Sequence, residues 1–124
     1  MIDPDCLFCK IVAGDIPADT VLETDDVLVF RDIAPQAPVH LLAVPKRHIP
    51  SIAEVGPEDH GLLGALVQAA NDAAGAFGLE DRGYRIASNV GDEAGQTVFH
   101  LHLHIMGGAP LGALAVTDLQ DRTP

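Results

Sequence analysis

Three histidines occupy alternate positions in the segment TVFHLHLHIMGG, which runs from residue 97 to residue 108. In an extended strand, successive side chains point to opposite faces of the sheet, with a rise of about 3.3 Å per residue. His100, His102 and His104 are therefore predicted to share one face, while the leucine and isoleucine residues between them share the core face. Because buried imidazoles need hydrogen-bond partners, the histidine face is expected to line an open or partly open pocket.

The spacing of this row argues against a single metal ion bound by all three histidines. The Cα atoms of His100 and His104 would lie roughly 13 Å apart in a strand, whereas a ligand nitrogen lies only about 2.0–2.1 Å from zinc. At most two neighbouring histidines can share an ion, so the row is predicted to divide its roles. The alternative is a polar strand face or a surface patch that binds metal adventitiously. Strict alternation of three of the six histidines favours a functional site.

A pair of cysteines near the start of the chain forms the motif Cys6-Leu-Phe-Cys9. Two thiolates at this spacing can bind one ion, and a tetrahedral structural site needs two further ligands. His48 and His100 are the available distant candidates, and two sulfur with two nitrogen ligands suit zinc. The pair could also be a redox dithiol or two unrelated buried thiols. The redox alternative is weaker, because the motif opens the chain instead of following a strand.

Hydrophobic periodicity predicts the elements that position these residues. The pattern from Pro57 to Gly78 has the spacing of one long amphipathic helix. The segment KIVAG, which ends at Gly14, predicts one or two helical turns near the N-terminus. Five strands are predicted, over residues 21–26, 27–33, 39–45, 84–90 and 98–106. The expected fold is α+β: a five-stranded, mostly antiparallel sheet with the long helix on one face and a short N-terminal helix.

The bulk properties limit the class of protein. The 124 residues suit a single domain, residues 1–124, that can bury a core without disulfides. The formal net charge of −11 would repel nucleic-acid polymers and anionic membranes, although a small anion can still bind where histidines and backbone N–H groups converge. The N-terminus lacks the basic start of a signal peptide, and no segment reaches the roughly 20 apolar residues of a membrane span. We therefore expect a protein of the reducing cytoplasm.

Longer motifs in the chain resemble one known family. The segment QTVFHLHLHIMGG resembles the signature of the histidine-triad (HIT) family, in which HxHxH is followed by an apolar pair and, in the Hint branch, by two glycines. The segment FRDIAPQAPVHLLAVPKRHI is similar to the first half of that branch, and SNVGDEAGQTVFH to its nucleotide-binding loop. The resemblance extends from about Cys6 to Gly108. Residues 109–124 form a variable C-terminal tail without the Trp- and Pro-containing ending of some Hint proteins, so the leaving group stays open.

The resemblance implies a HIT-like fold in a homodimer whose two five-stranded sheets join into one. It implies hydrolysis of purine nucleoside 5′-phosphoramidates and mixed nucleotidyl anhydrides, with His102 as the nucleophile, His104 in contact with the phosphate and His40 in support. The implied partners are purine nucleoside monophosphate derivatives and a second copy of the chain. Zinc-containing bacterial members have a structural metal with the same four ligands that spacing indicates. These are Cys6, Cys9, His48 and His100.

The resemblance also implies a nucleotide site. Asp32 would bind the ribose hydroxyls, with Ile33 beside it. The loop that holds the α-phosphate would contain Asn89, Gly95, Gln96 and Thr97. The walls of the purine pocket would include Phe8, Ile11 and Phe30. These three residues suit a plain hydrophobic core equally well.

A neutral imidazole can attack phosphorus near pH 7 and form a nucleotidyl-histidine, which splits one difficult displacement into two easier steps. We predict that His102 attacks the α-phosphorus, that the amine leaves protonated, and that water then releases the nucleotide. N–H groups between Gly95 and Thr97, with the Thr97 hydroxyl, are expected to stabilise the phosphoryl charge. One alternative is a dinucleoside polyphosphate hydrolase of the Fhit-like branch, against which the two glycines after the triad argue. The other is a nucleotide-binding or scaffolding module without catalysis.

Overall fold

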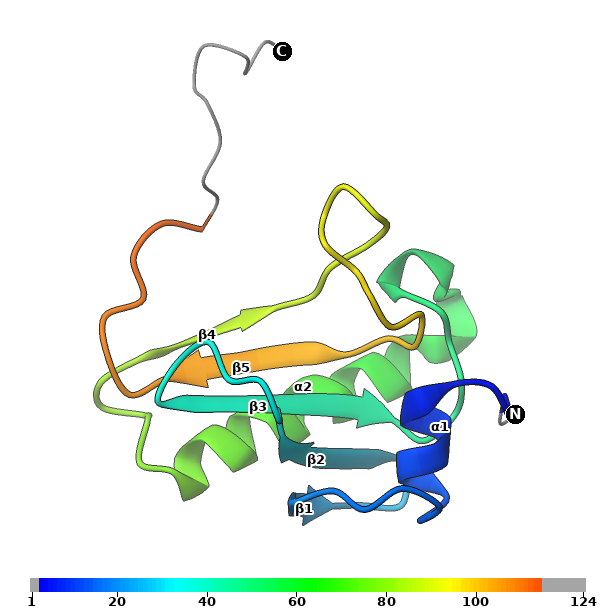
Figure 1. Ribbon diagram of the computed structural model, residues 1–124, viewed down its shortest axis with the longest axis horizontal. Helices are drawn as coiled ribbons and strands as arrows, with labels where there is room; N and C mark the ends of the chain where they lie inside the picture. Colours follow the sequence, from blue (N-terminus) through cyan, green and yellow to red (C-terminus); the bar gives the residue numbers. More distant parts are fainter. Residues whose placement is uncertain (1–2, 115–124) are drawn as a thin grey trace, which may run out of the picture.

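The computed structural model describes residues 3–114, in which a five-stranded sheet packs against one long helix (Figure 1). The strands are β1 (Thr20–Glu23), β2 (Val27–Arg31), β3 (Val39–Pro45), β4 (Tyr84–Ala87) and β5 (Leu103–Gly107). The helices are α1 (Leu7–Val12) and α2 (His60–Ala76), and two 3₁₀ turns, η1 (Ile52–Glu54) and η2 (Pro57–Asp59), precede α2. Neighbouring strands are antiparallel, in the order β1-β2-β3-β5-β4. The predicted α+β fold is confirmed.

The main core lies between the sheet and α2. The buried face of this helix carries one leucine and four alanines: Leu66, Ala69, Ala70, Ala73 and Ala74. Alternate side chains of the three central strands meet this face: Val27, Val29, Leu41, Ala43, Leu103 and Ile105. The buried face of the helix thus contributes mainly small side chains, and the sheet contributes mainly branched ones.

The short helix α1 covers the opposite face of the sheet, in front of β2 and β3 in Figure 1. A second cluster of buried side chains joins it to these strands: Cys6, Phe8, Cys9, Leu28, Phe30, Leu42 and Val44. Alternation along β2 and β3 thus directs one set of side chains toward α2 and the other toward α1. The sheet is the middle of three layers, and the histidine row lies on the α1 side.

The two helices begin at different residues from those predicted. Helix α1 starts at Leu7, inside the cysteine motif, because Cys6 is its N-cap and accepts a hydrogen bond at Sγ from the Cys9 N–H. The long helix is divided, since η2 forms its first turn and α2 proper begins at His60. Its end agrees with the prediction, because Gly78 follows with a positive φ of 69°.

The histidine row extends beyond the regular strand that was predicted to hold it. Strand β5 begins only at Leu103, so His100 and His102 lie in the segment before it. In that segment the N–H of Leu101 donates to the carbonyl oxygen of Ile49, a loop residue, at 2.6 Å. The chain still alternates, because the side chain of Leu101 is buried in the main core while both neighbouring rings face the α1 side.

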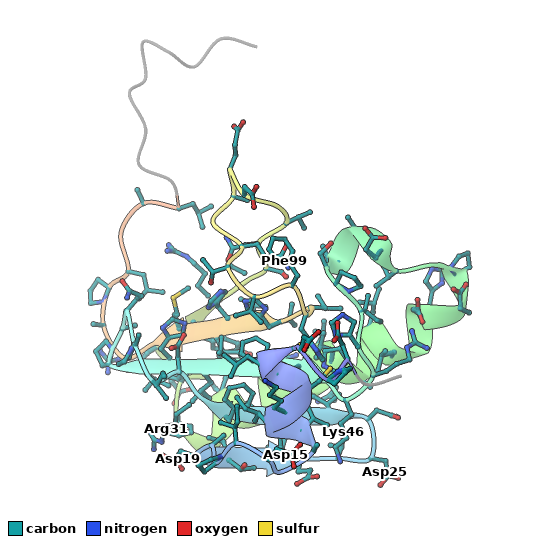
Figure 2. All side chains as sticks on the ribbon, turned by 45° about the vertical axis from the view of Figure 1, so that its right-hand side comes forward. Asp15, Asp19, Asp25, Arg31, Lys46 and Phe99 are labelled. Carbon is teal, nitrogen blue, oxygen red and sulfur yellow. The ribbon has the colours of Figure 1, made fainter. Side chains whose placement is uncertain are left out.

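Charged side chains gather along the outer edge of the sheet around β1 (Figure 2). Arg31 pairs there with Asp19 at 3.0 Å, and Lys46 pairs with Glu23 at 2.7 Å. Phe99 lies far from this edge, in the loop before β5, with half of its surface exposed (Figure 2). Within residues 3–114, neither α1 nor α2 combines the length and the apolar character that crossing a membrane requires.

Candidate active site

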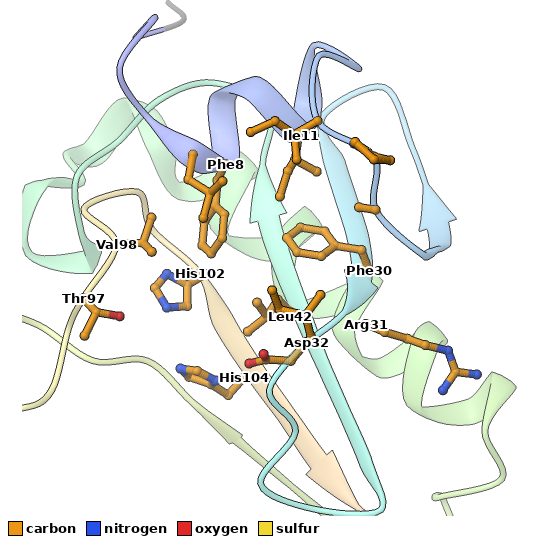
Figure 3. Close-up of a pocket in the computed structure, with 15 residues that line it drawn as sticks. Phe8, Ile11, Phe30, Arg31, Asp32, Leu42, Thr97, Val98, His102 and His104 are labelled. Carbon is orange, nitrogen blue, oxygen red and sulfur yellow. The ribbon is translucent and has the colours of Figure 1, made fainter.

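A pocket of about 250 Å³ opens between α1, strands β2 and β3, and the segment that leads into β5 (Figure 3). The predicted nucleotide residues in its lining are Phe8, Ile11, Phe30, Asp32, Ile33, Thr97, His102 and His104. The prediction missed seven others: Leu7, Ile16, Pro17, Ala18, Arg31, Leu42 and Val98. Leu42 could have been found, because it lies two residues after His40 on the same face of β3. Most of the others lie in loops, where no periodic pattern marks them.

The pocket has an apolar end and a polar end (Figure 3). Phe8 and Phe30 form part of the apolar end and meet edge to face, with ring centroids 5.6 Å apart. At the rim, the side chain of Ile33 is 98% exposed, so it is available to cover a ligand. Arg31 points away from the cavity, toward Asp19. Its side chain is half exposed, and its guanidinium lies 4.7 Å from the centre of the Phe77 ring.

His102 stands at the polar end with one ring nitrogen occupied. Its Nδ1 lies 2.7 Å from the carbonyl oxygen of His100. A carbonyl only accepts hydrogen bonds, so Nδ1 carries the hydrogen and Nε2 keeps its lone pair. The ring also packs against the ring of Phe8 in a T-shaped contact, with centroids 5.1 Å apart. The ring is thus positioned with a free nucleophilic nitrogen.

His104 and His40 form a second pair of rings at this end. His40 Nε2 lies 2.9 Å from His104 Nδ1 and 3.4 Å from Asp32 Oδ2, and the backbone N–H of Gln36 donates to His40 Nδ1 at 2.9 Å. Burial lowers the pKa of His104 to about 4. Burial also lowers the pKa of His40, an effect that the negative charge of Asp32 opposes. Both rings are therefore neutral near pH 7.

The loop from Asn89 to Thr97 uses several of its own polar groups to hold its shape. Asn89 donates from its side-chain amide to the carbonyl of Ala94 at 2.6 Å, and the N–H of Gly95 donates to Asp92 at 3.0 Å. No partner among residues 3–114 is found for the Thr97 hydroxyl, which is directed toward the histidines in Figure 3. The N–H groups of Gly95 and Gln96 donate within the loop, and the binding of a phosphate by residues 95–97 stays a prediction.

Gln96 belongs to this loop, but its side chain is turned inward and does not line the pocket. Its side chain is buried and donates to the carbonyls of Pro50 and Val98, at 2.8 and 3.1 Å, while accepting from the Gly91 N–H at 2.9 Å. Its backbone N–H donates to the carbonyl of Gly91. With these groups used inside the protein, Gln96 positions the loop. The family resemblance implied that Gln96 lies beside the phosphate, because a sequence motif gives the residue type and position but not the hydrogen bonds of the side chain.

The two cysteines, His48 and His100 meet at one point, as their spacing predicted. The four ligand atoms lie within 4.8 Å of one another. His100 Nδ1 lies 3.3 Å from Cys6 Sγ, 3.5 Å from Cys9 Sγ and 3.3 Å from His48 Nδ1. Neighbouring ligand atoms of a tetrahedral zinc site lie roughly 3.3–3.8 Å apart, given the usual zinc–nitrogen and zinc–sulfur distances. The donor set therefore fits a metal ion of this kind.

The ring of His100 is oriented for such a site. Its Nε2 lies 2.8 Å from the carbonyl oxygen of Pro45, so Nε2 carries the hydrogen. The lone pair of Nδ1 is then directed toward the two sulfur atoms, where a metal ion could accept it. Burial lowers the pKa of His100 to about 4 against the opposing effect of the Pro45 carbonyl, and a neutral imidazole is the form that binds metal. Burial also raises the pKa of the Cys9 thiol in the metal-free chain.

Comparison with known proteins gives matches along most of the chain. Residues 5–113 match the family described as scavenger mRNA decapping enzyme C-term binding. Purine nucleoside phosphoramidase from Escherichia coli is 40% identical over 110 residues, which are 89% of this chain and 92% of that protein. A HIT family hydrolase from Legionella pneumophila is 48% identical, with a TM-score of 0.83 over 87% of this chain and 100% of its own. A histidine triad protein from Clostridium difficile is 38% identical, with a TM-score of 0.89 over 93% of this chain and 100% of its own.

Proposed function

The chain belongs to the histidine-triad (HIT) family, and from this premise we propose that it hydrolyses purine nucleoside 5′-phosphoramidates through a nucleotidyl-histidine intermediate. The observation that carries the proposal is the ring of His102, whose Nδ1 is held by a carbonyl and whose Nε2 is left with a lone pair in the pocket. The similarity to the phosphoramidase of Escherichia coli supports the choice of substrate.

The two ends of the pocket suit the two ends of a nucleotide. The base would lie between the apolar side chains, which include Phe8, Phe30 and Ile11. The carboxylate of Asp32 would accept hydrogen bonds from the ribose hydroxyls. The phosphate would then reach the polar end, where the Thr97 hydroxyl can donate to a phosphoryl oxygen.

The reaction has two displacement steps. His102 Nε2 attacks the α-phosphorus, the bond from phosphorus to the substrate nitrogen breaks, and that nitrogen takes up one proton from solvent as the amine departs. Water then attacks the same phosphorus, the bond to His102 breaks, the attacking water returns one proton to solvent, and nucleoside 5′-monophosphate leaves. Each step exchanges one bond at phosphorus, so the free enzyme is restored.

We propose zinc as the metal held by Cys6, Cys9, His48 and His100. Bound there, zinc supplies a structural cross-link and takes no part in the displacement. The proposed assembly is a homodimer, because β4 is an outer strand with one backbone edge unpaired within the described residues. A mass of twice 13.0 kDa in solution, measured by light scattering, tests the dimer.

The deciding experiment is incubation of the protein with adenosine 5′-phosphoramidate, followed by chromatography of the nucleotide and mass spectrometry of the quenched protein. We expect adenosine monophosphate and a protein adduct heavier by one adenylyl group. His102→Ala should abolish both, because it removes the nucleophile, whereas His60→Ala, at an exposed position on α2, should retain both.

Retained turnover in His102→Ala would overturn the nucleophile assignment. Faster hydrolysis of diadenosine tetraphosphate than of the phosphoramidate would instead favour a dinucleoside polyphosphate hydrolase. Tight nucleotide binding without any turnover would favour a binding module.

A further inference from the structure

The backbone N–H of Gln36 decides which nitrogen of His40 carries a hydrogen. It lies 2.9 Å from His40 Nδ1 and can only donate. Nδ1 must therefore accept with its lone pair. The side chain of His40 is only 3% exposed, so solvent has little access to the ring. A neutral His40 in this position carries its hydrogen on Nε2.

The hydrogen on His40 in turn decides the state of His104. His40 Nε2 faces His104 Nδ1 at 2.9 Å, with Asp32 Oδ2 farther away at 3.4 Å. Since Nε2 of His40 is the donor, Nδ1 of His104 is the acceptor, and a neutral His104 carries its hydrogen on Nε2. This is the opposite of His102, which carries its hydrogen on Nδ1.

We propose that the backbone amide of Gln36 is a positioning group that sets the hydrogens of His40 and His104, so that His104 presents an N–H donor beside the lone pair of His102. The ring centroids of His102 and His104 are 5.0 Å apart, so donor and nucleophile can act on one phosphoryl group. The part that concerns the phosphoryl group rests on the proposed function, whereas the hydrogen positions do not.

The proposal also assigns the second cluster of candidate metal ligands. The ligand atoms of Asp32, His40 and His104 lie within 4.8 Å of one another. A metal on His40 Nε2 would have to displace the hydrogen there while the Gln36 N–H occupies Nδ1, which would leave an anionic ring. His40 and His104 are therefore a hydrogen-bonded relay with the Asp32 carboxylate beside it, and the candidate metal site among residues 3–114 is the cysteine cluster.

The loop that supplies the amide is itself held in place. The N–H of Asp32 donates to the carbonyl of His40 at 3.0 Å, and Asp32 Oδ1 accepts from the Ala34 N–H at 2.8 Å. The Gln36 side chain donates to the Ala34 carbonyl at 3.2 Å. One short segment thus carries both the carboxylate proposed for the ribose and the amide that sets the relay.

Nitrogen-15 NMR of the full-length wild-type protein tests the hydrogen positions directly. The chemical shifts of the ring nitrogens distinguish protonated from unprotonated atoms, and two-bond nitrogen–nitrogen couplings appear across N–H···N hydrogen bonds. We expect couplings from Gln36 N to His40 Nδ1 and from His40 Nε2 to His104 Nδ1. A hydrogen on Nδ1 of either histidine would overturn the proposal. Because this readout needs no substrate, it separates failure of the proposal from failure of the proposed function.

Two variants test whether the amide is the cause. Gln36→Pro removes the N–H, whereas Gln36→Ala keeps it and removes only the side chain. In Gln36→Pro we expect His40 and His104 each to show a mixture of the two neutral tautomers. We also expect kcat to fall by roughly two- to tenfold, which corresponds to the loss of one such hydrogen bond, and KM to change less. Gln36→Ala should retain the wild-type ring states. Unchanged ring states in Gln36→Pro would refute the causal role, and if that variant does not fold, the wild-type couplings decide.

Discussion

At the scale of single residues, the three histidines of the row offer different atoms because their backbone and ring neighbours differ. His100 is bonded at Nε2 to a carbonyl and turns Nδ1 toward the cysteines. His102 is bonded at Nδ1 and keeps Nε2 free. His104 accepts at Nδ1 in the relay proposed above. One residue type thus provides a candidate metal ligand, a candidate nucleophile and a donor within five positions.

The two histidines of the relay, of which His40 is buried and His104 partly buried, predict a dependence of stability on pH. Burial lowers the pKa of His104 to about 4 and lowers that of His40 in the same direction, while an unfolded chain has a histidine pKa of about 6.5. Between these values the unfolded state binds more protons, so stability falls as the pH falls from about 6.5 to 4. Each such group contributes a slope of up to about 1.4 kcal/mol per pH unit.

Urea unfolding between pH 7.5 and 4.5 measures this slope. His104→Asn should give a shallower dependence than the wild-type protein, because it removes one of the groups. His60→Asn, at an exposed position on α2, is the matched control and should leave the slope unchanged. Equal slopes in all three proteins would contradict the role of burial at His104.

Residue types in the chain were enough to find the groups that could do chemistry, but not their hydrogen-bond partners. The alternation of histidines and the spacing of the cysteines predicted residues that the fold brings together. The amide of Gln36 was not predicted, because every residue except proline has a backbone N–H and the sequence does not show where it points. For the same reason, the sequence could not show that Gln96 faces inward.

At the scale of elements, two loops position the segment that leads into β5. Gln96 joins the loop of residues 89–97 to the carbonyl of Pro50. The N–H of Leu101 joins the same segment to Ile49. The periodicity of residues 98–106 predicted a continuous strand, because it records which side chains are buried. Leu101 is buried by this loop contact as well as a strand would bury it, so the pattern alone could not locate the start of β5.

Because the side-chain amide of Gln96 is buried and hydrogen-bonded, we predict that both the conformation of the loop and the stability of the protein depend on this residue. Gln96→Met keeps the length of the side chain but leaves two carbonyls and one N–H without partners. We expect the free energy of unfolding in urea to fall by about 2–4 kcal/mol and the affinity for adenosine monophosphate, measured by calorimetry, to decrease.

Gln68 provides the control for this substitution. It lies exposed on α2, where its side chain bonds only to Asp72. Gln68→Met should change the stability by less than about 0.5 kcal/mol. If Gln96→Met behaves in the same way, Gln96 does not hold the loop.

At the scale of the whole molecule, the cysteine–histidine cluster joins parts of the chain that the sheet does not. Its ligands come from the N-cap and body of α1, from the loop after β3 and from the segment before β5. A metal ion there would tie α1 to the face that carries the pocket. Phe8 of the same helix contacts the ring of His102, so a shift of α1 would also move a side chain that positions the candidate nucleophile.

Removal of the metal should therefore weaken the protein without unfolding it, because the main core between the sheet and α2 does not involve the cluster. We expect purified protein to contain close to one zinc per chain, and chelation to lower the melting temperature while the circular dichroism of the sheet persists. Cys9→Ser should lose the metal and no longer respond to the chelator. Unchanged metal content in Cys9→Ser would show that the ion is bound elsewhere.

The apolar end of the pocket has a consequence for which nucleotides are consumed. Around Phe8, Phe30 and Ile11, the described lining offers no polar side chain that could distinguish the edge of one purine from another. Asp32, Thr97 and the histidines would bind the sugar and the phosphate, but no side chain in this part of the lining would distinguish adenine from guanine. Under the proposed function, the ratio of the nucleoside monophosphates formed would therefore follow the concentrations of the available phosphoramidates and not the identity of their bases.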